Sequence, residues 1–106
     1  MLDSPSLHEK NWEQRAERWR IQVRGALQGV GFRDFVYSLA TRLHLNGSVA
    51  SRSGAVAIEV EGTRTLLGDF LEEMWIGAPT QARIDQVSCH AGPVRGTDSF
   101  QIVSGD

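Results

Sequence analysis

The hydrophobic period of this chain changes abruptly between residues 19 and 43. Apolar Trp19, Ile21 and Val23 alternate with polar residues, the period of two that is typical of a half-buried strand. Three glycines follow within residues 25–31, and from Phe32 the apolar residues recur at the spacing of an amphipathic helix. This stretch therefore predicts a strand, a glycine loop and a helix in direct succession.

The rest of the sequence predicts four more strands and one more helix. We expect Asn46-Gly47 to end the first helix with a left-handed glycine cap, and Thr63 to cap the second. The alternation of the strand near 82–89 fails at Asp85-Gln86, which predicts a β-bulge. The expected strands are 19–24, 47–51, 55–61, 82–89 and 100–103, and the apolar helix stripes are 32–43 and 67–75, the second including Met74 and Trp75.

This order of elements is βαββαβ with a short extra strand. Two apolar helix stripes need a sheet face to cover, so we expect an α/β (α+β) ferredoxin-like sandwich, with both helices on one face of an antiparallel sheet. A chain of 106 residues suits one domain. Residues 1–17 are polar and are expected to form a mobile tail, leaving residues 18–106 as the domain.

Composition excludes several classes of function. The formal net charge of −2 argues against broad binding to nucleic acid, which usually needs a basic face. No apolar run reaches the roughly 18 residues that cross a membrane. A single cysteine, Cys89, indicates a reducing compartment, and we expect a cytoplasmic protein in which Cys89 is a small strand residue rather than a nucleophile. The three histidines are scattered, so no metal site is expected.

The segment Gln28-Gly-Val-Gly-Phe-Arg33 is the candidate site. Its glycines let successive backbone N–H groups turn toward one point, just before a helix N-terminus that already favours an anion. Arg33 can fork onto two oxygens of a phosphate. From composition alone, a plain glycine turn with a solvated Arg33 explains the segment equally well, because neither common phosphate-binding fingerprint is present.

The run Val23-Arg-Gly-Ala-Leu-Gln-Gly-Val-Gly-Phe-Arg-Asp-Phe-Val36 resembles the signature of the acylphosphatase family, and the resemblance extends over nearly all of residues 19–103. It implies the ferredoxin-like fold and hydrolysis of acyl phosphates without a metal or an organic cofactor. It places the family's water-positioning asparagine at Ser51, and a tryptophan usual in the family at Ser48. The phosphate-binding residues that it implies are Leu27, Gln28, Gly29, Val30, Gly31, Phe32 and Arg33.

The chain is also similar to the acylphosphatase-like domains that begin the carbamoyltransferases of hydrogenase maturation. Phe35-Val-Tyr-Ser-Leu-Ala40 and Ala82-Arg-Ile-Asp-Gln-Val87 carry this likeness. Two functions stay open. One is in-line hydrolysis of a small acyl phosphate, with Arg33 on the phosphoryl group and Ser51 on the water. The other is a catalytically weak domain that binds phosphate or carbamoyl phosphate as part of a larger carbamoyltransferase.

Three further alternatives concern other residues. An RNA-recognition domain shares the βαββαβ order, but residues 55–61 contain no aromatic residue on which a base can stack. Asp34 suits the helix dipole better than the role of general base. A cluster of arginines around the first strand is interpreted as a solvated outer face, with a partner-binding patch as the alternative; its members are Arg15, Arg18, Arg20 and Arg24.

Overall fold

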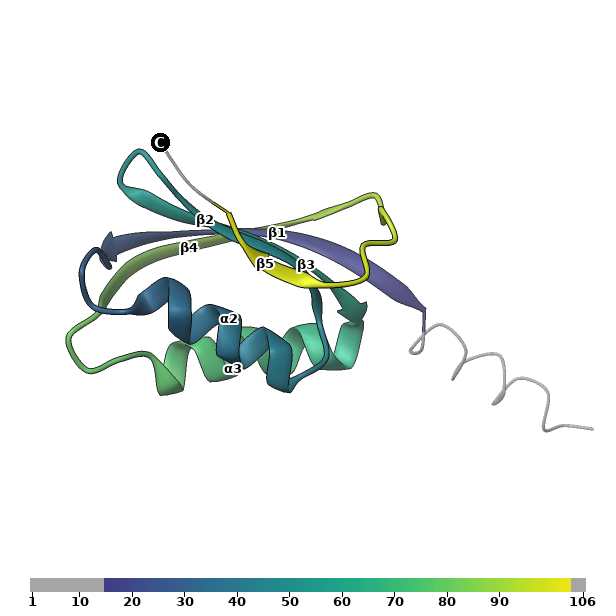
Figure 1. Ribbon diagram of the computed structural model, residues 1–106, viewed down its shortest axis with the longest axis horizontal. Coiled ribbons are helices and arrows are strands. Elements are labelled where there is room, and N and C mark those ends of the chain that lie inside the picture. The colour runs from purple at the N-terminus through teal and green to yellow at the C-terminus, as the bar shows by residue number, and fades with distance from the viewer. Residues whose placement is uncertain (1–14, 104–106) are drawn as a thin grey trace, which may run out of the picture.

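The computed structural model describes residues 15–103, which form five strands and two helices (Figure 1). The elements are β1 (Ala16–Ala26), α2 (Phe32–Arg42), β2 (Asn46–Arg52), β3 (Ala55–Thr63), α3 (Arg64–Gly77), β4 (Arg83–Gly92) and β5 (Phe100–Ile102). The predicted mobile tail lies outside the described residues except for its last three, and of these Ala16 and Glu17 belong to β1.

The strands form one sheet in the order β4-β1-β3-β2-β5, and both helices cover the same face of it (Figure 1). The prediction of a ferredoxin-like sandwich is confirmed. The prediction of a wholly antiparallel sheet holds for four strands only, because β5 pairs in parallel with β2. The chain leaves β4 at one edge, crosses the end of the sheet through residues 93–99 and reaches the opposite edge as β5.

The core lies between the sheet and the two helices. Alternate residues of β1 and β3, including Ile21 and Ile58, are fully buried against the predicted helix stripes. Met74 of α3 is also fully buried, but Trp75 is 49% exposed, so its assignment to the core stripe is wrong. Trp75 follows Met74 by one helical step of about 100°, which turns its side chain away from the sheet. Other fully buried side chains are Val23, Phe32, Val36, Leu39, Leu45, Val49, Val60, Leu67 and Phe70.

The end of α2 differs from the prediction. The helix ends at Arg42, and His44 takes the left-handed conformation with φ 59°. The N–H of Leu45 donates to the carbonyl of Ala40 at 2.9 Å and that of His44 to Thr41 at 3.1 Å, which is the Schellman pattern of a helix C-terminus. Gly47 is instead a strand residue of β2, where a Cβ would lie 1.8 Å from the Glu59 carbonyl oxygen. Close packing of β2 on β3, and not a helix cap, explains this glycine.

Two local predictions are confirmed. The Thr63 hydroxyl accepts a hydrogen bond from the N–H of Leu66 at 3.3 Å and caps α3. In the β1–β4 ladder Arg24 pairs with Gln86 and Gly25 pairs with Ile84, which leaves Asp85 as the extra residue of a bulge. Within residues 15–103, neither helix combines the length and the apolar character that a membrane span needs.

Candidate functional site

The loop between β1 and α2 presents the start of a helix to solvent. Gly29 and Gly31 have φ values of 76° and 77°, a left-handed conformation that side chains other than glycine rarely adopt. Gly31 is the N-cap residue of α2 and brings no side chain to cap it. The first N–H groups of the helix therefore point outward without an intrahelical partner, toward any anion placed there.

Two buried side chains fix this loop on the core. Leu27 is 6% exposed and Phe32 is 1% exposed, and both belong to the main hydrophobic cluster. They stand on either side of residues 28–31, so the loop is held at both ends by packing. A loop anchored in this way keeps its N–H groups in one arrangement, which lowers the entropic cost of binding a ligand.

A cavity of about 610 Å³ lies between this loop and the β2–β3 hairpin. The two segments are at the same end of the sheet (Figure 1). Arg33 reaches the cavity from the first turn of α2, and Ser51 from the end of β2. The lining residues are Gly25, Leu27, Gln28, Gly29, Gly31, Phe32, Arg33, Asp34, Ser51, Arg52, Ser53, Gly54, Ala55 and Val56.

The structure brings nearly all of the predicted site residues to this cavity. Of the seven predicted phosphate-binding residues, only Val30 does not line it, because its side chain packs against the hydrophobic core instead. Ser51 pairs with Val56 in the β2–β3 ladder and is half-buried. Since Val56 and the neighbouring Val49 are buried, Ser51 lies on the helix-facing side of the sheet, toward the loop.

The charges of the cavity wall are mixed. Arg33 and Asp34 are adjacent and exposed on the first turn of α2, and Arg52 stands on the hairpin. Within residues 15–103, neither Arg33 nor Arg52 forms a salt bridge. Two guanidinium groups, the outward N–H groups of α2 and its dipole together make a wall that attracts anions.

Other candidate residues lie elsewhere. Cys89 is a largely exposed residue of β4, but partial desolvation raises the pKa of its thiol, which favours the protonated form and not a nucleophilic thiolate. Among residues 15–103, no group of three or more histidines, cysteines and carboxylates is placed to hold a metal ion. β3 carries no aromatic residue, and the aromatic residue of β1, Trp19, packs against the core.

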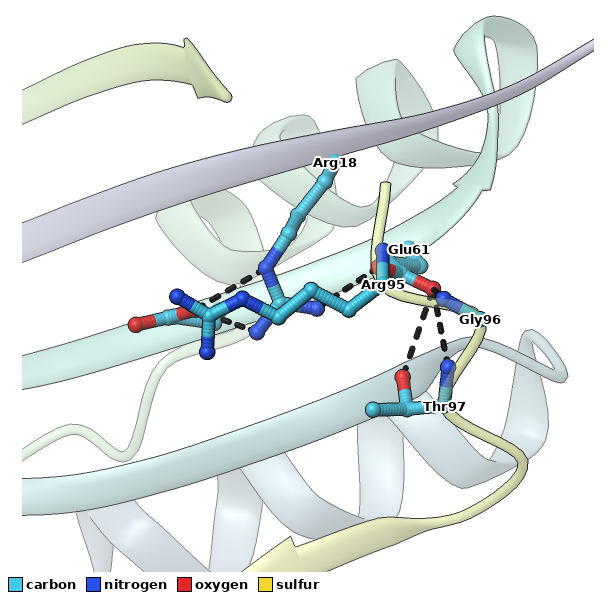
Figure 2. A network of polar contacts seen from close by, with 6 residues as sticks. Arg18, Glu61, Arg95, Gly96 and Thr97 are labelled. Carbon is cyan, nitrogen blue, oxygen red and sulfur yellow. Dashed lines mark hydrogen bonds and ion pairs between the residues drawn. The ribbon is translucent and has the colours of Figure 1, made fainter. Parts of the chain in front are cut away.

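Sequence reasoning missed a buried ion-pair network at the other end of the sheet (Figure 2). The prediction of a solvated Arg18 is wrong, because Arg18 is 7% exposed and pairs with Glu59 and Glu61 of β3. Its Nη1 lies 2.7 Å from Glu61 Oε2, and its Nε lies 2.9 Å from Glu59 Oε1. The available signal was the matching alternation of arginines in β1 and glutamates in β3, but the register that joins them is not visible in either strand alone.

Glu61 also holds the crossover between β4 and β5. Its carboxylate accepts hydrogen bonds from the N–H groups of Arg95, Gly96 and Thr97, and from the Thr97 hydroxyl (Figure 2). Burial alone would raise the pKa of Glu61, but the Arg95 N–H and the Arg18 guanidinium outweigh it and lower this pKa. The Arg18 guanidinium likewise lowers the pKa of Glu59. The network secures the fold and lies away from the cavity.

Comparison with known proteins agrees with the fold. The five-stranded sheet, its two helices and the loop between β1 and α2 define a small α+β sandwich with a glycine loop at a helix N-terminus. The family model for acylphosphatases matches residues 19–102. An acylphosphatase of Synechococcus sp. (strain WH7803) is 39% identical over 90 residues, which cover 83% of this chain and 88% of that protein. The chain belongs to the acylphosphatase family.

Longer proteins contain the same domain. Carbamoyltransferase HypF of Rhizobium leguminosarum bv. viciae is 40% identical over 100 residues, which are 94% of this chain but 13% of that protein. Full-length HypF, crystallised in a phosphate- and nucleotide-bound form, superposes with a TM-score of 0.84 at 32% identity, over 87% of this chain and 12% of HypF. The acylphosphatase of Bacillus subtilis superposes with a TM-score of 0.78 at 34% identity, over 82% of this chain and 98% of the enzyme.

Proposed function

We propose that this chain hydrolyses the carboxyl–phosphate bond of acyl phosphates by in-line attack of water. The observation that carries the proposal is the shared cavity, which is lined by the glycine loop, Arg33 and Ser51. Membership of the acylphosphatase family supports the same reaction. The lone cysteine fits a cytoplasmic location, which we propose with it.

For this reaction the protein has to position the substrate and the water and to stabilise negative charge on the phosphoryl oxygens. A water oxygen bonds to phosphorus while the bond from phosphorus to the acyl oxygen breaks. The products are a carboxylate and inorganic phosphate, and the protons of the water pass to the phosphate and to solvent. Because the leaving carboxylate is already stable as an anion, no strong general acid is needed. Stabilising the charge on the phosphoryl oxygens and aiming the water are enough.

Different residues of the cavity bind the phosphoryl group and position the water. The N–H groups of the loop and of the first turn of α2 bind the phosphoryl oxygens, and the Arg33 guanidinium forks onto two of them. Ser51, on the opposite wall, accepts a hydrogen bond from the attacking water. Its hydroxyl is shorter than the carboxamide that the family resemblance places there, so it holds the water with less reach. Neither role requires a metal ion.

The test is hydrolysis of benzoyl phosphate by the purified chain and three variants. Arg33→Ala is expected to lower kcat/KM by about 10²–10³, the usual effect of removing one positioned donor. Arg42→Ala removes the same charge from the exposed far end of α2 and is expected to leave kcat/KM unchanged. Ser51→Asn is expected to raise kcat. Turnover that does not depend on Arg33 would contradict the proposed site.

A second function is favoured by Ser51 and by the match to much longer carbamoyltransferases. In this alternative, the cavity binds the phosphate of carbamoyl phosphate within a larger protein and turns it over weakly. It predicts that the chain binds inorganic phosphate but hydrolyses benzoyl phosphate at most weakly, and that Ser51→Asn raises this turnover. An unmodified chain that turns over benzoyl phosphate rapidly would exclude it.

A further inference from the structure

Arg52 is a second cation on the cavity wall, and the proposed chemistry does not use it. It is the last residue of β2, is exposed, and lines the same cavity as Arg33. Its guanidinium has no salt-bridge partner among the described residues, so it is available to an anionic ligand. Asp34 is the one carboxylate among the lining residues, so the wall keeps a net positive charge.

The turn beside Arg52 fixes the position of its backbone. Arg52 pairs with Ala55 across the ladder, which leaves the two residues Ser53 and Gly54 to connect β2 and β3. Their φ values of 45° and 80° are both positive, as in the type I′ turn that suits tightly paired strands. Arg52 is therefore held at the rim of the cavity by a short hairpin and not by a long loop.

The cavity places its two arginines on different walls. Arg33 comes from the loop–helix wall and Arg52 from the hairpin wall. A cavity of about 610 Å³ is within the range that holds a whole small molecule and exceeds the needs of a phosphate group. Ser51 and Arg52 are neighbours in β2 and start from opposite faces of the sheet. In-line attack puts the acyl part on the side of phosphorus away from the water at Ser51, so the acyl part extends over the rim of the cavity, where Arg52 stands, and not past Ser51.

We propose that Arg52 makes this site select acyl phosphates whose acyl part carries a second negative charge, such as a distal carboxylate. The inference rests on the proposed function, because it takes the phosphoryl group to lie against Arg33. A guanidinium binds a carboxylate through two parallel N–H···O bonds, which gives both attraction and orientation. A neutral acyl group of the same shape gains neither.

The kinetic test compares two acyl phosphates of one shape. In 4-carboxybenzoyl phosphate the distal group is charged, and in 4-carbamoylbenzoyl phosphate it is neutral. The unmodified chain is expected to favour the charged substrate in kcat/KM. Arg52→Gln is expected to lower kcat/KM about fivefold for the charged substrate and less than about twofold for the neutral one, as befits a charge-assisted contact at an exposed site. Arg42→Gln, the matched loss of charge, should leave the ratio of the two substrates unchanged.

A binding measurement separates this inference from the proposed reaction. The non-hydrolysable β-ketophosphonates of the same two acyl groups are titrated into the chain by calorimetry. If neither acyl phosphate is hydrolysed but the charged phosphonate binds more tightly in an Arg52-dependent way, the reaction is overturned and the selectivity stands. If both substrates are hydrolysed equally well, and Arg52→Gln changes neither, the selectivity is overturned and the reaction stands.

Inorganic phosphate is the remaining control. Arg52→Gln is expected to change the affinity of the chain for inorganic phosphate by less than about twofold, because the proposed contact of Arg52 is with the acyl part of the substrate. A loss of phosphate affinity in Arg52→Gln as large as the loss for the charged phosphonate would mean that Arg52 binds the phosphoryl group itself. That result would overturn the assignment of Arg52 to substrate selection.

Discussion

Arg18 of β1 lies directly opposite Glu61 of β3, and its Nη1 donates a hydrogen bond to Glu61 Oε2 at 2.7 Å. Both side chains are on the sheet face that the helices leave uncovered, yet both are buried. The same carboxylate holds the N–H groups at residues 95–97, so one side chain joins two strands to the segment that carries the chain across the end of the sheet.

Glu61→Gln is expected to lower the free energy of unfolding by about 2–3 kcal/mol, because it leaves Arg18 buried with one carboxylate and weakens the bonds to the crossover. Urea unfolding measures the change. Glu72→Gln, at an exposed carboxylate of α3, is the matched control and should change stability by less than about 0.5 kcal/mol. Equal effects of the two substitutions would contradict the structural role of Glu61.

The same network predicts how stability depends on pH. The pKa values of Glu59 and Glu61 are lower in the folded chain than their ordinary value of 4.5, so between the two values the unfolded chain binds more protons. Their stabilisation is therefore fully present above about pH 4.5 and is lost as pH falls through the folded pKa values. Urea unfolding between about pH 3 and 6 should show this loss, and Glu61→Gln should make it shallower. An identical pH dependence in the variant would count against the lowered pKa of Glu61.

Gly25 is expected to tolerate no side chain. A Cβ at this position would lie 1.9 Å from the carbonyl oxygen of Arg83, at a backbone φ of 153°. Gly25→Ala should lower the free energy of unfolding by about 3 kcal/mol or more, because β4 must move away from β1. Gly54→Ala is the control: its φ is also positive but its Cβ meets open space, so only backbone strain of about 1 kcal/mol is expected. Similar losses in both variants would show that the contact with β4 does not matter.

His44→Gly is expected to stabilise the protein. His44 occupies the left-handed position after α2, where glycine carries no steric penalty. The gain should be about 0.5–1 kcal/mol in the free energy of unfolding. His90→Gly, in the exposed strand β4, should instead destabilise by a similar amount, because glycine is unfavourable within a strand. A loss of stability in His44→Gly would contradict the Schellman geometry.

The parts of the fold that sequence could predict depend on local periodicity. The apolar stripes of both helices, the Thr63 cap and the bulge at Asp85 each follow from a few neighbouring residues. The glycine loop between β1 and α2 also follows from its own residues, although composition alone left a plain glycine turn and an anion site equally open. The end of α2 could not be predicted in this way. Gly47 has the residue type of a helix cap, but contact with its hairpin partner β3 determines its role, and His44 adopts a conformation that is rare for its residue type.

Two features could not be predicted from the sequence. One depends on the pairing register of two strands, and the other on a cavity that is lined by separate segments of the chain. The alternation of β1 suggested a solvated face for Arg18, and only pairing with β3 shows that two glutamates surround it. Likewise, Arg52 is the last residue of β2, and nothing in its neighbouring sequence indicates a site. It lines the cavity because the hairpin and the loop meet at the same end of the sheet. In both cases the residues that meet are too far apart in the sequence for a local pattern to reveal the contact.

Binding of inorganic phosphate, followed by amide chemical shifts in NMR, tests the central claim most directly. The claim is that the glycine loop and Arg33 bind a phosphoryl group. It predicts that the largest shifts fall on the N–H groups of Gly29, Gly31 and Phe32, with the Arg33 side chain, and that Arg33→Ala abolishes them while Arg42→Ala does not. Shifts confined to the arginines of the outer sheet face, or unchanged by Arg33→Ala, would contradict it.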